Sequence, residues 1–196
     1  MSQNCYNLLT FWGNTKVSAQ VAQWKSRIDE VIDSGKTSND SNTILSILLA
    51  ESSNGREAEI GVGLVGFESE IINAGNNQIG ILSSGQRPEL LEEALACFLY
   101  KLDKNVVVRN SFHNLDGLYG VAYTAPYDST SAYSQFTSIV CDYDDFEFPE
   151  DAELDAEEKL EEAENEIIEL FVDDMPETKS KFKKNIAKGR IDWDSI

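Results

Sequence analysis

The fold class follows from residues 5–35, which read CYNLLTFWGNTKVSAQVAQWKSRIDEVIDSG. Residues 5–12 mix aromatic and aliphatic side chains in a short run that Gly13 and Asn14 close, a pattern typical of a strand followed by a turn. Apolar residues then recur every three or four positions up to Gly35, where a helix commonly stops: Val17, Val21, Trp24, Ile28, Val31 and Ile32. The stretch predicts a strand and then a helix whose apolar face lies on a sheet.

The central part of the chain predicts several short elements. Residues 43–50 (TILSILLA) form an apolar run that fits a strand or a helix, with a weak preference for strand. Residues 58–66 and 78–82 are expected to be extended, with a turn at 75–77 between them. A second helix should begin at Pro88 and bury a stripe formed by Leu91, Ala94, Leu95, Phe98 and Leu102.

The last third predicts strands and then a long acidic helix. Residues 106–108, 120–124 and 136–143 alternate and are bounded by turn residues, which favours antiparallel strands. Residues 149–172 have helical spacing, with an apolar stripe of Leu160, Ala163, Ile167, Leu170 and Phe171, and Pro176 should end this helix. We therefore expect an α+β sandwich, with an antiparallel or mixed sheet, two helices on one face and a C-terminal acidic helix. The expected divisions are a globular domain (1–145), an acidic helical extension (146–176) and a basic amphipathic tail (177–196).

The net charge of −19 is concentrated near the end of the chain. Residues 142–177 carry 18 acids against Lys159, whereas residues 178–196 carry six basic groups against two acids. The negative electrostatic field of these acids repels nucleic acid and anionic membranes and attracts basic protein surfaces. We therefore expect a basic protein partner and no direct nucleic-acid or membrane partner. The first residues lack a secretory pattern and the three cysteines are widely spaced, which predicts a cytoplasmic location, or the host cytoplasm if the protein is viral.

Enzyme chemistry finds little support in the sequence. His113 is the only histidine, so any Ser–His or Cys–His nucleophile would have to use it, and it stands in a predicted exposed hairpin turn at 111–117. Residues 61–66 match G-x-G-x-x-G, but too few residues follow for a crossover helix, and a Gly-rich strand or bulge is the better interpretation. We predict no catalytic residue and no cofactor.

Two ligand sites remain as alternatives. Asp142, Asp144 and Asp145 supply the oxygen ligands that Mg²⁺ or Ca²⁺ prefers, although the calcium-loop pattern fails at the residues that follow. The helix start at 83–88, with Arg87, could accept an anion, although most such residues are only caps. A metal-dependent enzyme or small-ligand-binding protein would combine the aspartates with Arg87 or His113.

The acidic helix gives the leading hypothesis. Nine acids and one lysine lie between Glu153 and Glu169, which is about one net charge per 3 Å of helix, close to the phosphate spacing of about 3.4 Å along one DNA strand. We predict that these acids bind a basic protein by nucleic-acid mimicry, through Asp155, Glu157, Glu158, Glu161, Glu162 and Glu164. Alternatively the helix is solvated, or neutralised by its own basic tail. A third hypothesis is an assembly subunit that self-associates through Phe171, Phe182 and Trp193.

The N-terminal segment also carries a family resemblance. Residues 4–13 (NCYNLLTFWG), with a helix directly after them, resemble the N-terminal signature of the YubB-like family of phage and plasmid accessory proteins. Residues 123–126 are similar to that family's aromatic and Thr-Ala segment. The resemblance implies a ferredoxin-like domain on a mobile element and supplies no catalytic residues. It favours an accessory factor that acts by binding, such as an inhibitor of a basic host nucleic-acid-binding or defence protein.

Overall fold

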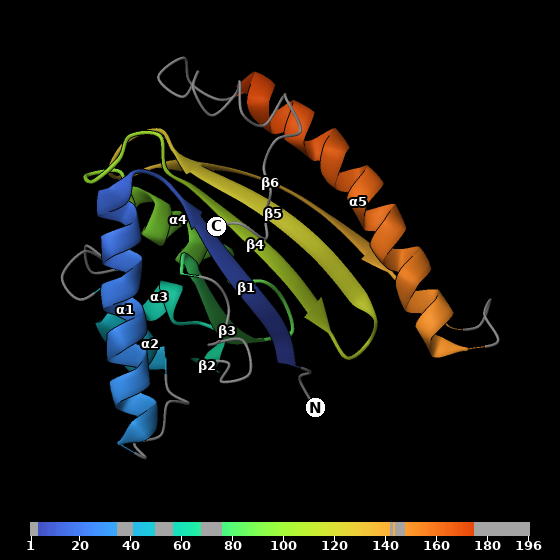
Figure 1. Ribbon diagram of the computed structural model, residues 1–196, viewed down its shortest axis with the longest axis horizontal. Coiled ribbons are helices and arrows are strands. Elements are labelled where there is room, and N and C mark those ends of the chain that lie inside the picture. Colours follow the sequence, from blue (N-terminus) through green and yellow to red (C-terminus); the bar gives the residue numbers. More distant parts are fainter. Residues whose placement is uncertain are drawn as a thin grey trace.

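The computed structural model describes residues 4–34, 41–49, 57–67, 76–141, 143 and 148–174. One antiparallel six-stranded sheet with the order β2-β3-β1-β4-β5-β6 forms its centre, and helices lie on both faces (Figure 1). The strands are β1 (Asn4–Trp12), β2 (Leu64–Phe67), β3 (Gln78–Ser84), β4 (Val107–Asn114), β5 (Leu118–Pro126) and β6 (Ala132–Val140). The helices are α1 (Thr15–Asp33), α2 (Ser41–Leu48), α3 (Glu57–Ile60), α4 (Glu89–Leu99) and α5 (Pro149–Asp174).

The predicted first strand and first helix are confirmed. Asn14 caps α1, because its side-chain oxygen accepts hydrogen bonds from the backbone N–H groups of Lys16 and Val17. Trp24 on α1 is 1% exposed and meets Phe11 of β1 edge to face, with 5.6 Å between the ring centroids. The helix is therefore held on the sheet by the apolar spacing that predicted it.

The sheet face that carries Phe11, Ile81 and Val108 is called the inner face below. Helices α1, α2 and α4 cover it and form the main hydrophobic core with it. Helix α4 begins at Glu89, one residue after the predicted start at Pro88, and fully buries Leu91 and Leu95. The predicted packing of two helices on one face of a sheet thus holds for α1 and α4.

Two predictions for the central part of the chain are wrong. Residues 43–50, expected as a strand, belong largely to helix α2, because its buried positions 44, 45, 47 and 48 share one face only with helical spacing. Residues 58–66, expected to be extended, contain helix α3, a turn and only then β2. Gly63 in that turn has φ +79°, a conformation that favours glycine, and the register of β2 against β3 shifts between Leu64 and Gly66. The expected glycine-rich bulge is therefore present.

The opposite, outer face carries Trp12, Val107 and Tyr123 and is covered by α5 (Figure 1). Ile167 and Phe171 of α5 belong to the same buried cluster as these three residues. Nearer the start of the helix, Ala152 and Ala156 pack on Cys141, just after β6. The predicted acidic helix is confirmed, and it forms a third layer against the sheet.

The first four strands follow the element order β-α-β-β-α-β, with α1 and α4 as the main helices. This is the order of a split-βαβ motif. Strands β5 and β6 extend the sheet beyond β4, and α2 and α3 are inserted before β2. The α+β class is confirmed, and the finer ferredoxin-like assignment stays a prediction.

Candidate functional site

The side of α5 that points away from the sheet is strongly acidic. Helix α5 holds thirteen acids and one lysine, a net charge of −12. Ten of these acids have exposed side chains and are called the acidic face: Asp151, Glu153, Glu157, Glu158, Glu161, Glu162, Glu166, Glu169, Asp173 and Asp174. At 1.5 Å per residue the helix is about 39 Å long, so it presents an extended array of charge.

Aromatic packing fixes the C-terminal half of this helix. The ring of Phe171 is fully buried between Tyr123 and Tyr133, with 5.6 Å between its centroid and each of theirs. The hydroxyl of Tyr133 also lies 2.9 Å from a carboxylate oxygen of Asp174, to which it donates a hydrogen bond. The last turns of α5 are therefore anchored on β5 and β6.

A charged cluster fixes the middle of the helix. Arg109 on β4 donates two hydrogen bonds to Glu164, with Nε–Oε1 2.9 Å and Nη2–Oε2 3.1 Å, and Tyr123 donates a third. Burial lowers the pKa of Arg109, but the ion pair with Glu164 outweighs it, so this pKa is raised. Burial and the Glu164 charge raise the pKa of Tyr123, which stays a protonated donor. The cluster sets how far α5 is rotated about its axis.

The six predicted partner-binding residues do not form one set. Glu157, Glu158, Glu161 and Glu162 are exposed on the acidic face. Asp155 makes a surface ion pair with Lys159 at 2.6 Å. Glu164 has a side chain only 13% exposed and is bound to Arg109, so it anchors the helix and is not available to a partner. It lies four residues after Leu160 and three before Ile167, which places it on the buried stripe.

Arg87 lies on the inner face and is already neutralised. Its Nη1 lies 2.6 Å from Glu92 and its Nη2 lies 3.0 Å from Glu89, while its guanidinium carbon stands 4.6 Å above the ring centre of Phe136. Glu92 is 1% exposed, and burial raises its pKa although the charge of Arg87 opposes the rise. Because two carboxylates occupy the guanidinium, the predicted anion site at 83–88 is not supported.

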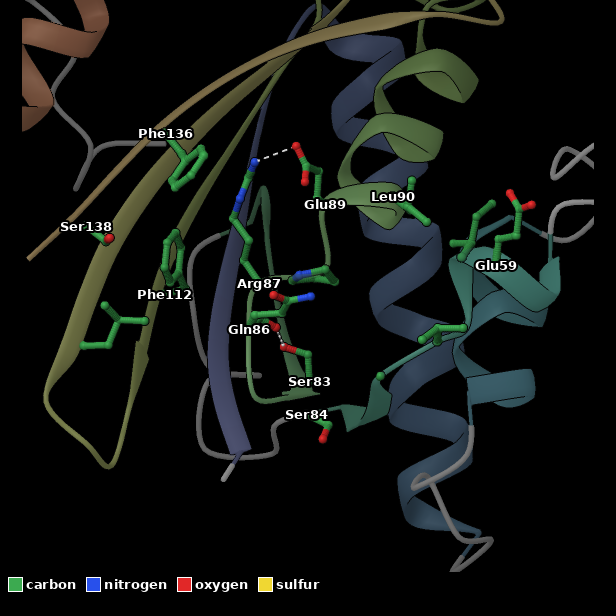
Figure 2. Close-up of a pocket in the computed structure, with 15 residues that line it drawn as sticks. Glu59, Ser83, Ser84, Gln86, Arg87, Glu89, Leu90, Phe112, Phe136 and Ser138 are labelled. Carbon is green, nitrogen blue, oxygen red and sulfur yellow. Dashed lines mark hydrogen bonds and ion pairs between the residues drawn. The ribbon is translucent and has the colours of Figure 1, made fainter. Parts of the chain in front are cut away.

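A groove of about 380 Å³ lies beside Arg87 on the inner face (Figure 2). Its strand side carries Phe112, Leu118, Phe136 and Ser138, and its helix side carries Glu59, Val62, Glu89 and Leu90. Figure 2 shows Phe136 and Phe112 on one side of Arg87 and Leu90 and Glu59 on the other. The surface, called the inner groove below, combines apolar side chains with the Arg87–Glu89 ion pair, so it suits a partner with apolar side chains and polar groups.

A scan of protein-family models, a search of curated proteins and a search of solved structures each gave no match.

His113 lies on the outer face and does not meet Arg87. Its ring stacks between Tyr6 and Tyr119, with centroid distances of 5.1 and 6.0 Å. Partial burial lowers its pKa. The structure thus gives no shared site for His113 and Arg87, the two residues proposed to assist a metal-dependent reaction.

The predicted metal ligands Asp142, Asp144 and Asp145 lie outside the described residues, as do Phe182, Trp193 and the basic tail. Within the described ranges, no group of three or more His, Cys, Asp or Glu side chains is arranged to hold a metal ion. In the same ranges, no helix is both long enough and apolar enough to cross a membrane.

Proposed function

We propose that this chain is a non-enzymatic binding protein whose acidic face captures a basic protein by nucleic-acid mimicry. The observation that carries the proposal is the docking of α5, since the helix buries one stripe while ten of its acids stay exposed. A helix that was not packed on the domain would present its charges in many orientations. Because α5 is packed on the sheet, its charges have one fixed arrangement, which favours binding to a partner with a rigid basic groove.

The charges of the acidic face also repel one another. Glu157 with Glu161 and Glu158 with Glu162 stand four residues apart and are exposed. Each such pair costs about 0.2–0.5 kcal/mol. A basic partner removes this repulsion on binding, so part of the strain contributes to affinity. The natural partner on this view is a nucleic-acid-binding or defence protein in the host cytoplasm, in keeping with the accessory role that the N-terminal resemblance implies.

Charge reversal tests the proposal. We would replace Glu157, Glu158, Glu161 and Glu162 with Lys and measure the binding of polylysine and of purified basic nucleic-acid-binding proteins at low and moderate salt. We expect the native chain to bind, with affinity falling as salt rises, and the variant to lose binding.

A control variant changes the net charge by the same amount elsewhere. It carries Lys in place of Asp29, Glu30 and Asp33 and also of Ala22 and Ser26, five exposed residues of α1, which lies on the opposite face of the sheet from α5. Both variants thereby change the net charge by eight units. This control should keep most of the binding, because the local field of α5 is unchanged. If both variants lost binding equally, net charge alone would explain the binding, and the proposal of mimicry by α5 would be wrong.

The alternative, a metal-dependent or small-ligand function at Asp142, Asp144 and Asp145, stays a prediction. Calorimetry with Mg²⁺, Mn²⁺ and Ca²⁺ tests it, since tight stoichiometric binding is expected only for that function. The third hypothesis, an assembly subunit, predicts self-association that light scattering on the isolated chain detects.

A further inference from the structure

Strand β6 is a nine-residue strand at the edge of the described sheet. It reads AYSQFTSIV and contains no charged residue and no proline. Natural proteins normally shield such edges with lysine, proline, bulges or very short strands, because a free edge pairs with other chains. No strand among the described residues lies beyond β6 in the sheet. The edge is therefore suited to accept another strand.

The backbone groups that face outwards follow from two hydrogen bonds. The N–H of Tyr127 donates to the carbonyl of Ser131 at 2.9 Å, and the N–H of Cys141 donates to that of Gly117 at 2.8 Å. Because the hydrogen-bonded pairs of an antiparallel ladder alternate, these two bonds fix which residues of β6 bond to β5: every second residue, counted from Ser131 to Cys141. The N–H and C=O groups of the alternate residues point to the free edge: Ala132, Ser134, Phe136, Ser138 and Val140.

Apolar side chains lie exposed on the inner side of this edge. Phe136 is 54% exposed and Val140 is 68% exposed, and across the inner groove Leu90 is 38% exposed. Phe136 and Val140 are themselves among the residues of β6 whose backbone groups face outwards, whereas Leu90 belongs to α4. A strand added to β6 would cover them with every second one of its own side chains.

Helix α5 lies on the outer side of the same edge. Tyr133 of β6 bonds to Asp174, so helical spacing places Leu170, four residues earlier, on the flank of α5 towards β6, whereas Glu162 and Glu166 lie opposite Glu164 and face away from the sheet. Leu170 is 55% exposed although its neighbour Phe171 is fully buried. The remaining side chains of an added strand would meet Leu170 and would lie in the negative field of α5.

The charges decide which strand fits. Pairing with a second copy of this chain would bring two α5 helices, each of net charge −12, onto the same face of a joined sheet. A basic segment gains attraction at the same position, and lysine and arginine stems also cover apolar surface. We propose that the free edge of β6 binds an extended segment of the basic partner as a seventh strand, with Lys or Arg towards α5 and apolar residues towards the inner groove. This inference rests on the proposed function and names how the partner docks.

Substitutions of Ser138 test the edge directly. Ser138→Pro removes one outward N–H and leaves the bonds to β5 intact, whereas Ser138→Ala keeps that N–H. The probe is a fluorescent peptide of alternating lysine and valine, measured by anisotropy on the full chain, with a glutamate–valine peptide for comparison. We expect Ser138→Pro to weaken binding of the lysine peptide at least about fivefold, and Ser138→Ala to leave it unchanged. The glutamate peptide should not bind.

Amide exchange and shift mapping by NMR complete the test. The amides of Phe136, Ser138 and Val140 should exchange rapidly in the free chain and become protected when the lysine peptide is added. Protection in the free chain, through self-association or the chain's own tail, would overturn the inference. So would lysine-peptide binding that Ser138→Pro leaves unaffected.

The two proposals fail in different ways. If charge reversal of α5 abolishes binding while Ser138→Pro has no effect, the acidic-face function stands and the edge inference is wrong. If neither change matters, both are wrong. Loss of binding in both variants, with Ser138→Ala unaffected, supports both.

Discussion

Replacing Phe171 with Ala should separate the acidic helix from the sheet or severely weaken their contact. Phe171 is fully buried, and its ring pairs with Tyr123 and Tyr133 at 5.6 Å each. Truncating a buried phenylalanine costs about 3–5 kcal/mol. Each lost aromatic pair accounts for about 0.5–1.5 kcal/mol beyond its buried area, which argues for the upper part of that range. Because a domain of this size is stable by only about 5–15 kcal/mol, the loss should be large.

Urea denaturation followed by far-UV circular dichroism measures this loss. The control is Leu170→Ala, which changes the adjacent but 55% exposed side chain and should alter stability by about 0.5 kcal/mol or less. If α5 detaches as a separate unit, the Phe171 variant will show a first transition of helical signal before the sheet unfolds. A Phe171→Ala variant as stable as Leu170→Ala would refute the docked arrangement of α5, and with it the fixed acidic face.

Three further predictions concern buried or stacked ionisable groups. Glu164→Gln leaves Arg109 without its counter-charge and should destabilise the fold by about 2–4 kcal/mol in urea denaturation, whereas exposed Glu157→Gln should change stability by about 0.5 kcal/mol or less. The pKa of His113 is lowered in the folded chain, so the single imidazole signal in NMR should titrate below pH 6.5. The contribution of this lowered pKa to stability is present above pH 6.5 and is lost as pH falls through the folded pKa. His113→Gln should remove this dependence of stability on pH. The pKa of Glu92 is raised in the folded state, so its effect on stability depends on pH in the opposite direction. Stability should fall as pH rises from 4.5 through the folded pKa, and Glu92→Gln should flatten this part of the pH profile.

The regular elements could be predicted because their apolar residues repeat over several turns. Helix α1 and helix α5 each show that repeat over many residues, and both predictions are confirmed. Helix α2 was missed because the helical spacing of its four buried residues extends over only eight positions, and so short an apolar run also fits a strand. In such a short run the packing of the neighbouring elements decides between a strand and a helix.

The candidate site was predictable in part, for a related reason. The charge density of α5 is visible in the sequence, but counting acids does not separate those that face solvent from Glu164. Its spacing from Leu160 and Ile167 held that information, and helical geometry alone would have placed it on the buried side. The contact of Glu92 with Asn110 at 2.7 Å joins α4 to β4 and depends on tertiary packing that no local pattern encodes. An acid in the first turn of a helix reads as a favourable dipole contact only.

The balance of forces on α5 leaves repulsion between its acids in the folded chain. Several like-charge pairs at about 0.2–0.5 kcal/mol each give a repulsion of a few kcal/mol, whereas each buried apolar side chain such as Phe171 or Ile167 contributes about 1.5–3 kcal/mol. The burial of these side chains therefore outweighs the repulsion, so α5 stays packed on the sheet and its acids still repel one another in the folded chain. Salt screens this repulsion, with a Debye length of about 8 Å at 0.15 M, so moderate salt should raise the stability of the free protein. The same salt should weaken a complex with a basic partner. If the acidic face is the binding surface, replacing Glu157, Glu158, Glu161 and Glu162 with Lys should reduce both salt dependences together, whereas loss of one alone would contradict it.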